Sequence, residues 1–175
     1  LLFHSSVLFA ADISVSSSDS IQIAIANASS GDALILSSGT YSECLNTSGK
    51  NLTIRGDSVS TTTIDGSSCS TNSVEITGGE NVIFENVSLK NTNGRVFSVE
   101  GSILTLENVN VSDSGSNSTN GPAVNALDNS NVTINNSIFE DNGASSTSGT
   151  AKGGSIYIDE GVILTINNST FQGSY

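Results

Sequence analysis

The stretch VTINNSIFEDN (132–142) decides the fold, because its pattern returns along most of the chain. It opens on an apolar–Thr–apolar triplet, and Asn136 follows two residues after that triplet. Another apolar residue, Phe139, comes three positions later. Apolar–x–apolar triplets also occur at 52–54, 82–84, 104–106 and 164–166. A short unit that recurs in this way is typical of a repeat protein, in which each unit packs on its neighbours.

The repeated units differ in length at one place. The asparagines that follow the triplets are Asn86, Asn108, Asn136 and Asn168, which are 22, 28 and 32 residues apart. The growth falls in one connection, which spans 91–94, then 112–121, then 140–152. Each of these connections is rich in Gly, Ser, Asn and Asp, which favour surface turns. We therefore expect insertions at one corner of an otherwise constant scaffold.

We interpret the repeat as an all-β parallel β-helix (a solenoid) of about five to six coils, each with three short strands. Equivalent strands of neighbouring coils would pair in parallel, about 4.8 Å apart. Because side chains alternate along a strand, the outer residues of each triplet should face the core and the central residue the solvent. The expected inward rows are Ile54, Phe84, Leu106, Ile134 and Ile166, and Leu89, Val111, Phe139 and Phe171.

The asparagines that follow the triplets lie at one expected corner. We predict that Asn86, Asn108, Asn136 and Asn168 form a hydrogen-bonded ladder of stacked amides there, with Asn86 and Asn168 sheltered. An antiparallel sandwich also uses many short strands and polar turns. Two-residue hairpin signals are scarce in this sequence, however, so the repeat favours the parallel arrangement.

The start of the chain predicts a short capping helix. Asp19 or Ser20 can cap a helix over 21–28, and residues 33–36 then begin the first coil. Residues 1–11 (LLFHSSVLFAA) are apolar, and they fit either the remnant of a signal peptide or an ordered cap. We expect residues 12–175 to be a single β-helix domain. The repeat still runs at Tyr175, so we expect an N-terminal fragment of a longer protein.

Several stretches resemble known β-helix proteins. The run DALILSSGTYSE (32–43), with KNLTIRG (50–56) and TTTIDG (61–66), resembles the opening of right-handed parallel β-helices of the pectin-lyase-like superfamily. FEDN (139–142) and GGSI (153–156) resemble the paired repeats of polymorphic outer membrane proteins and related surface proteins. The resemblance implies a right-handed β-helix over about 19–175, and a surface location.

Composition excludes several classes of protein. Ser, Asn, Thr and Gly supply 87 of the 175 residues, and such residues disfavour a helical bundle. The formal net charge is -12, with 5 Lys and Arg against 17 Asp and Glu. A nucleic-acid partner is therefore not expected, since phosphate binding needs clustered basic residues. No apolar run approaches the roughly 18 residues of a membrane span.

Whether the two cysteines are bonded and whether the glycosylation sequons are used depends on the cellular compartment of the protein. Cys44 and Cys69 would lie on neighbouring coils, so they can form a disulfide in a secreted protein; two buried free thiols are the alternative. Sequons for N-glycosylation are frequent, and they are used only in a eukaryotic secretory pathway. Asn117 on a long connection is the best candidate, followed by Asn110 and Asn131.

No catalytic constellation emerges from the sequence. The resemblance to the pectin-lyase-like superfamily implies activity as a polysaccharide lyase or hydrolase. Hydrolysis of a glycosidic bond needs two carboxylates about 5 to 10 Å apart. Glu85 and Glu107 occupy equivalent positions on adjacent coils, but Asn135 and Asn167 follow on the next two. The other groups considered are Asp57, Asp65, Glu75, Asp113, Lys50, Arg55, Lys90 and Arg95. We assign no catalytic, cofactor or metal-binding residue.

These observations predict a non-catalytic, secreted or cell-surface β-helix. It would serve as a structural stalk, an adhesion scaffold or a building block of a surface appendage. Its partners would be glycans, host or self surface proteins, or further copies in a fibre, contacted through 112–121 and 140–152. The alternative is the N-terminal part of a polysaccharide-processing enzyme whose catalytic coils lie beyond residue 175.

Overall fold

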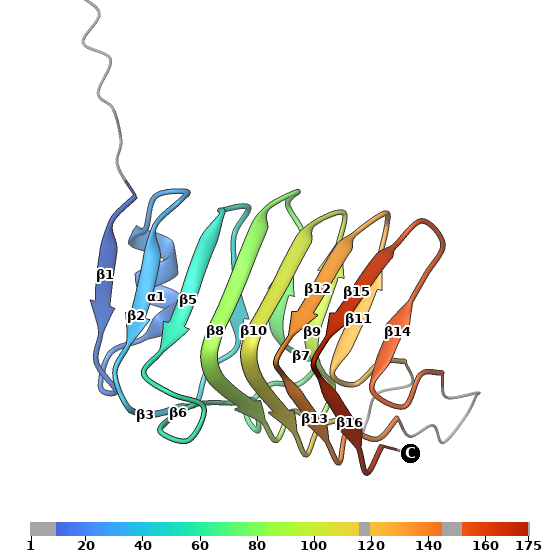
Figure 1. The fold of residues 1–175 in the computed structure, drawn as a ribbon. Helices are drawn as coiled ribbons and strands as arrows, with labels where there is room; N and C mark the ends of the chain where they lie inside the picture. Colours follow the sequence, from blue (N-terminus) through green and yellow to red (C-terminus); the bar gives the residue numbers. More distant parts are fainter. Residues whose placement is uncertain (1–9, 116–119, 145–151, 175) are drawn as a thin grey trace, which may run out of the picture.

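The chain forms two sheets of parallel strands and one short helix. The computed structural model describes residues 10–115, 120–144 and 152–174. All pairings between the named strands are parallel. Figure 1 shows equivalent strands of successive units side by side along the molecule. The prediction of a mostly β chain with parallel pairing is confirmed.

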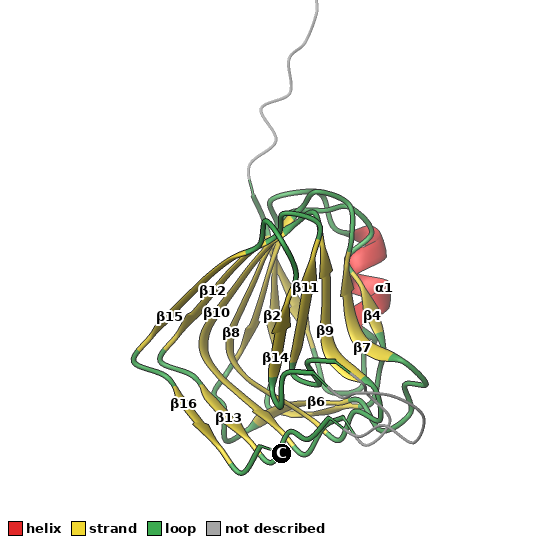
Figure 2. Cartoon of the chain, turned by 90° about the vertical axis from the view of Figure 1, so that its right-hand side faces the viewer, coloured by secondary structure: helices red, strands yellow, loops and turns green. Residues whose placement is uncertain are grey.

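The larger sheet runs in the order β1–β2–β5–β8–β10–β12–β15. These strands are β1 (Asp12–Val15), β2 (Ala33–Leu36), β5 (Leu52–Gly56), β8 (Asn81–Lys90), β10 (Ile103–Ser112), β12 (Asn131–Asn135) and β15 (Ile163–Asn167). Paired off this path are β3 (Gly39–Tyr41), β6 (Thr62–Asp65), β13 (Ile138–Glu140) and β16 (Thr170–Gln172). The ten-residue strands β8 and β10 continue through the bend that separates β12 from β13 and β15 from β16 (Figure 2).

The second sheet runs in the order β14–β11–β9–β7–β4. Its strands are β4 (Leu45–Asn46), β7 (Asn72–Ile76), β9 (Arg95–Glu100), β11 (Val124–Leu127) and β14 (Ile156–Ile158). In the view along the stack, the two sheets form adjoining walls around a common interior (Figure 2). The expected third strand of each unit is therefore present in this sheet.

Strand register places the predicted inward rows next to one another. Ile54 pairs with Phe84, Phe84 with Leu106, and Leu106 with Ile134. The second row behaves in the same way, since Val111 pairs with both Leu89 and Phe139. The rows that were predicted from the sequence are thus confirmed at the level of strand register.

The interior is a continuous apolar core. In β5, Leu52 and Ile54 are buried while Thr53 between them is partly exposed, and the other repeated triplets of β8, β10 and β12 follow the same alternation. Phe84 and Phe97 meet edge to face with ring centroids 5.1 Å apart, which joins the two sheets. Burial of such side chains supplies the main favourable free energy of folding.

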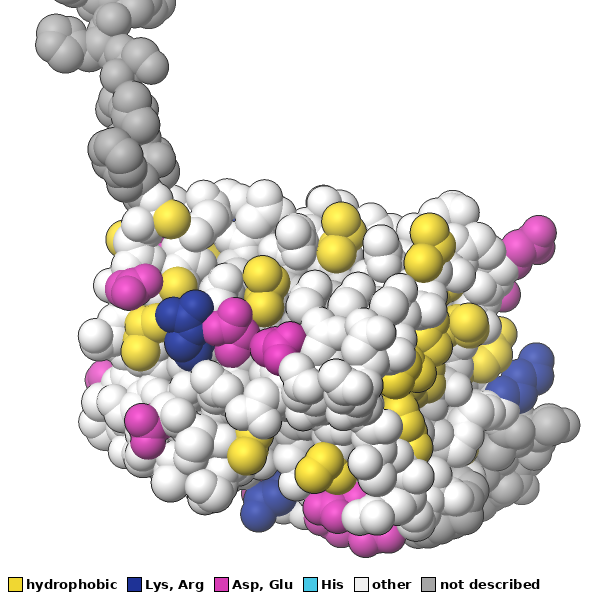
Figure 3. Space-filling view, in the orientation of Figure 1, with side chains coloured by type: hydrophobic (Ala, Val, Ile, Leu, Met, Phe, Trp, Pro, Cys, Tyr) yellow, Lys and Arg dark blue, Asp and Glu magenta, His cyan; other side chains and the backbone are white. Residues whose placement is uncertain are grey.

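The last strands depart from the expected pattern. Ile166 is 43% exposed and Phe171 is 39% exposed, although both were predicted to face a closed core. They stack on Ile134 and Phe139 on one side only, because β15 and β16 are the last strands of their ladders. A cavity of about 490 Å³ opens here, and apolar side chains gather at this end (Figure 3).

Helix α1 (Ile21–Asn27) lies at the opposite end of the stack, where Ile21 and Ile25 enter the core. Ser20 is its N-cap and accepts a hydrogen bond from Ile23 N, so one of the two predicted caps is confirmed. Ala28 is the C-cap rather than the last helical residue that the sequence suggested. Its extended backbone ends the helix one residue early.

The first coil binds both ends of this helix through charged side chains. The Glu43 carboxylate accepts hydrogen bonds from Ile21 N (2.8 Å) and Gln22 N (3.1 Å). These amides lie in the first turn, where no helix carbonyl is available to accept from them. At the other end, Lys50 Nζ donates to Ile25 O (2.7 Å) and to Ala26 O (2.8 Å). Both charges have the sign that complements the helix dipole.

The prediction for residues 1–11 falls mostly outside the described part of the chain. The first described strand begins at Asp12, and most of the segment 1–11 lies outside the described residues. The hypothesis of a signal-peptide remnant or cap therefore stays a prediction. In the described part of the chain, no helix is long and apolar enough to cross a membrane.

Candidate functional site

The candidate site is the insertion corner, where the chain passes from the larger sheet to the second sheet. Its departure side is a stack of buried polar residues, Thr92, Ser114 and Asn142. Gly115 N donates to Thr92 O (2.9 Å), and Gly143 N donates to Ser114 O (3.0 Å). Each insertion therefore leaves from a point that is hydrogen-bonded to the unit below.

The return side is bonded in the same unit-to-unit manner. Asn120 and Lys152 form a parallel bridge, and Gly121 N donates to Lys152 O (3.1 Å). Arg95 Nε donates to Asn120 O (3.2 Å), which connects this bridge to the start of β9. Because both ends of the insertions are fixed, a change in their length need not alter the sheets.

The tips of the two long insertions, residues 116–119 and 145–151, lie outside the described residues. Asn117, the first glycosylation candidate, is among them. The described flanks carry charges of both signs, since Asp113, Asp141 and Lys152 are all exposed. The described flanks thus combine buried polar residues with exposed charged side chains.

The predicted asparagine ladder is formed only in part. Asn108 Nδ2 donates to Asn86 Oδ1 (2.7 Å), but Asn136 Nδ2 donates to Glu107 Oε1 (2.7 Å) instead of to Asn108. Asn168 was expected to be sheltered, but it is exposed in the described structure, directly after β15 at the end of the strand order. What all four share is a left-handed backbone, with φ values between 48° and 54°.

A second left-handed corner was missed by the sequence reasoning. Asn91, Asp113, Asp141 and Gly173 have φ values between 52° and 63°. Each follows the first-corner asparagine of its unit by five residues, and this spacing in the sequence could have revealed the corner. Asn, Asp and Gly are the residues that adopt this conformation at the lowest cost.

The outward face of the larger sheet carries the only carboxylate pair that the sequence analysis singled out. Glu85 and Glu107 are register partners on β8 and β10. Arg55 Nε lies 2.5 Å from Glu85 Oε2, and Figure 3 shows basic and acidic side chains adjoining on this face. Glu107 accepts from Asn136. Both carboxylates thus have hydrogen-bonding partners on the exterior of the sheet.

Three of the remaining acidic candidates, Asp57, Asp65 and Glu75, accept hydrogen bonds from neutral side chains, whereas Asp113 is exposed at the insertion corner. Asp57 accepts from Ser38 Oγ (2.9 Å), and Asp65 accepts from Asn91 Nδ2 (2.9 Å). Asn46 and Asn72 both donate to Glu75. Within the described ranges, no group of three or more His, Cys, Asp and Glu side chains is placed to hold a metal ion.

The other candidate bases are spread over the molecule. Lys50 binds the helix carbonyls, and Arg95 lies at the insertion corner. Lys90 pairs in register with Asp65 at the end of β8. The structure therefore does not bring the bases together around the Glu85–Glu107 pair.

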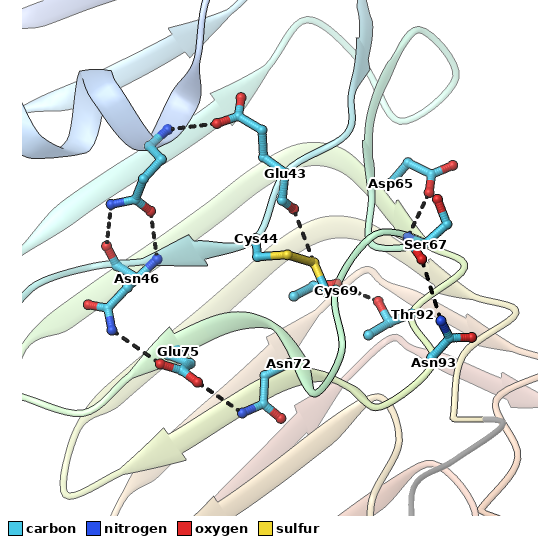
Figure 4. The surroundings of a disulfide bond; sticks show 12 residues. Glu43, Cys44, Asn46, Asp65, Ser67, Cys69, Asn72, Glu75, Thr92 and Asn93 are labelled. Atoms are coloured by element: carbon cyan, nitrogen blue, oxygen red, sulfur yellow. Dashed lines mark hydrogen bonds between the residues drawn. A yellow bond between two sulfur atoms is a disulfide. The ribbon is translucent and has the colours of Figure 1, made fainter.

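Cys44 and Cys69 form the disulfide that the sequence predicts, with an S–S distance of 2.11 Å. It joins the segment before β4 to the segment before β7, as Figure 4 shows. A network of amide and carboxylate groups surrounds it, in which Asn46 and Asn72 meet at Glu75. The alternative of two free thiols is wrong.

The other two glycosylation candidates lie within strands. Asn110 is half-buried on β10, and its Nδ2, the atom to which a glycan would be attached, donates to Glu140 Oε1 (3.3 Å). Asn131 is the half-buried first residue of β12. Their use as glycan acceptors stays a prediction.

Comparison with protein-family models, with curated proteins and with solved structures finds no match for this chain.

Proposed function

We propose that the chain is a segment of a right-handed parallel β-helix, similar to the pectin-lyase-like superfamily, that acts as a non-catalytic scaffold at the cell surface or outside the cell. The observation that carries the proposal is the contrast between constant sheets and a growing corner. Strand register is kept from β8 to β15, while the connections at the insertion corner lengthen from unit to unit. Solenoid proteins with insertions on one face commonly use that face for binding.

Two further observations support the proposed location and role. The Cys44–Cys69 disulfide fits an oxidising compartment. The Glu85–Glu107 pair lies on an outward sheet face, where Arg55 and Asn136 engage the two carboxylates. In this proposal the chain acts in adhesion, or as part of a stalk or appendage, and the residues that contact its partner lie on the two long insertions.

A loop-replacement variant tests this proposal. Residues 113–121 are replaced by the four residues of the shortest equivalent, Asn-Thr-Asn-Gly (91–94). The free energy of loop closure changes only slowly with loop length, so we expect the free energy of unfolding of the variant to lie within about 1 kcal/mol of the wild-type value. Wild-type protein should bind at least one component of a glycan array or an extracellular-matrix panel, and the variant should lose that binding.

The outcomes separate the scaffold from its alternatives. Binding that survives both this replacement and the same replacement at 141–153 would contradict a recognition role for the insertion corner. An enzymatic role predicts instead the release of unsaturated or reducing products from polyuronides incubated with the chain and Ca²⁺. Such products, absent with Glu85→Gln, would overturn the non-catalytic proposal.

A further inference from the structure

We propose that the Cys44–Cys69 disulfide is a redox-sensitive tether that controls whether helix α1 covers its end of the core. Cys44 lies in the segment 43–50, which we call the cap-binding segment because it contacts both ends of the helix. Immediately before the cysteine, Glu43 accepts from the first amides of the helix. Two residues after it, Asn46 N donates to Gln22 Oε1 (2.8 Å), and Gln22 Nε2 donates back to Asn46 O (3.2 Å). Figure 4 shows Cys44 in the same segment as Glu43 and Asn46.

Backbone pairing holds the cap-binding segment weakly. Its strand, β4, has only two residues and is the last strand of the second sheet, so β7 alone pairs with it. Thr47 adds hydrogen bonds to Glu75 and to the buried carboxylate of Glu80. The disulfide is the covalent connection between this segment and the next unit. Its loss leaves the two-residue pairing of β4 and the side-chain hydrogen bonds of Asn46 and Thr47 to position the groups that cap the helix.

The helix depends on those groups. It has seven residues, and a helix of this length is not stable in water without tertiary contacts. Its own Ile21 and Ile25 are fully buried, whereas Ile23 is 64% exposed. Release of the cap-binding segment would therefore open the helix and expose apolar side chains at this end of the core.

The exposure of the two cysteines determines which sulfur atom a reductant attacks. Cys44 is exposed, whereas Cys69 is 1% exposed and its Sγ lies 3.6 Å from Glu43 O. A thiolate of a dithiol reductant attacks Cys44 Sγ, the S–S bond breaks, and Cys69 leaves as a thiolate that takes up a proton. The second thiol of the reductant then displaces Cys44 and closes a cyclic disulfide. The protein disulfide is reduced and the dithiol is oxidised.

Hydrogen exchange of the full chain, with and without dithiothreitol, tests the proposal. We expect amides of helix α1 and of residues 43–46 to exchange about tenfold faster after reduction, since loss of a helix cap changes the opening equilibrium by roughly that factor. Amides in the centre of β8 and β10 should keep their rates. Unchanged exchange in α1, or equal acceleration in β8 and β10, would overturn the tether.

A double-mutant cycle gives a second test that does not need a reductant. Glu43→Gln should speed α1 exchange in the oxidised protein, because the amide side chain accepts these hydrogen bonds less strongly. In the Cys44→Ser/Cys69→Ser variant the same change should add little, since the helix is already released. Fully additive effects would show that the disulfide and the cap act independently. Ser67→Ala, beside the disulfide but outside the cap contacts, serves as the control and should leave α1 exchange unchanged.

Discussion

Asn108 Nδ2 donates a hydrogen bond of 2.7 Å to Asn86 Oδ1, and so connects β10 to β8 at the corner that follows the repeated triplet. The two residues have φ values of 52° and 54°. The same residue type thus meets two requirements there: a left-handed backbone, and an amide that reaches the neighbouring unit. A glycine would meet only the first requirement, and a serine would meet both requirements less well than asparagine does.

Substitutions at Asn108 should separate these two roles. Asn108→Ala forces an alanine into the left-handed region, so we expect a loss of about 1–2 kcal/mol in the free energy of unfolding, besides the lost hydrogen bond. Asn108→Gly removes the bond but suits the backbone, and it should cost less. Urea unfolding of both variants measures the difference. An alanine variant as stable as the glycine variant would contradict this explanation of the corner.

The repeat in the sequence predicts the strands and their register, because inward residues must stack on their own equivalents. Leu106, for example, could be matched to Phe84 and Ile134 from spacing alone. The second corner at Asn91 and Asp113 also has a regular spacing, but Asp and Asn are so frequent here that it did not stand out. Glycine replaces them at 173, which obscured the pattern further.

Loss of core volume at Phe84 should be strongly destabilising. Phe84 is fully buried and meets Phe97 between the two sheets, so Phe84→Ala should cost about 3–5 kcal/mol. Ile163, which is 61% exposed on the outward face of β15, is the matched control, and Ile163→Ala should change stability by less than about 0.5 kcal/mol. Thermal and urea unfolding test both. Comparable losses at the two positions would show that the inward row is misplaced.

The charges around helix α1 could not be found from the sequence. Glu43 and Lys50 lie 22 and 25 residues from the groups they bind, and no local pattern specifies that separation. Lys50 was considered only as a candidate base. The exposure of Ile166 and Phe171 also depends on what packs beside them, which the alternation of side chains does not encode.

Asp32 should make stability depend on pH in the acidic range. The backbone amides of Ala11 and Ser29 donate to its carboxylate, and they lower the pKa of Asp32 below its ordinary value of 3.8. A lowered folded-state pKa means that its contribution is complete above pH 3.8 and is lost as the pH falls through the folded value. Urea midpoints should therefore fall as the pH is lowered below about 3.8, and they should fall less steeply in Asp32→Asn. Equal slopes for the two proteins would exclude this role.

The ion pair on the outward face should contribute little. The side chains of Arg55 and Glu85 are 43% and 24% exposed, so water and salt screen their attraction. We expect Arg55→Ala to lower stability by less than about 1 kcal/mol, with the difference shrinking at high salt. Unfolding at low and high NaCl measures this. A larger loss that persists at high salt would mean that Arg55 matters through packing instead.

Cysteine pairs across β10 and β12 test most directly the central claim, that successive units stack in parallel and in register. Thr105 and Thr133 are register partners on the outward face. Neighbouring strands about 4.8 Å apart bring partner residues within disulfide reach, whereas a partner two residues along lies beyond it. After mild oxidation, Thr105→Cys/Thr133→Cys should form a second intramolecular disulfide, and Thr105→Cys/Asn135→Cys should not. The reverse result, or no bond in either variant, would contradict the stacked parallel arrangement.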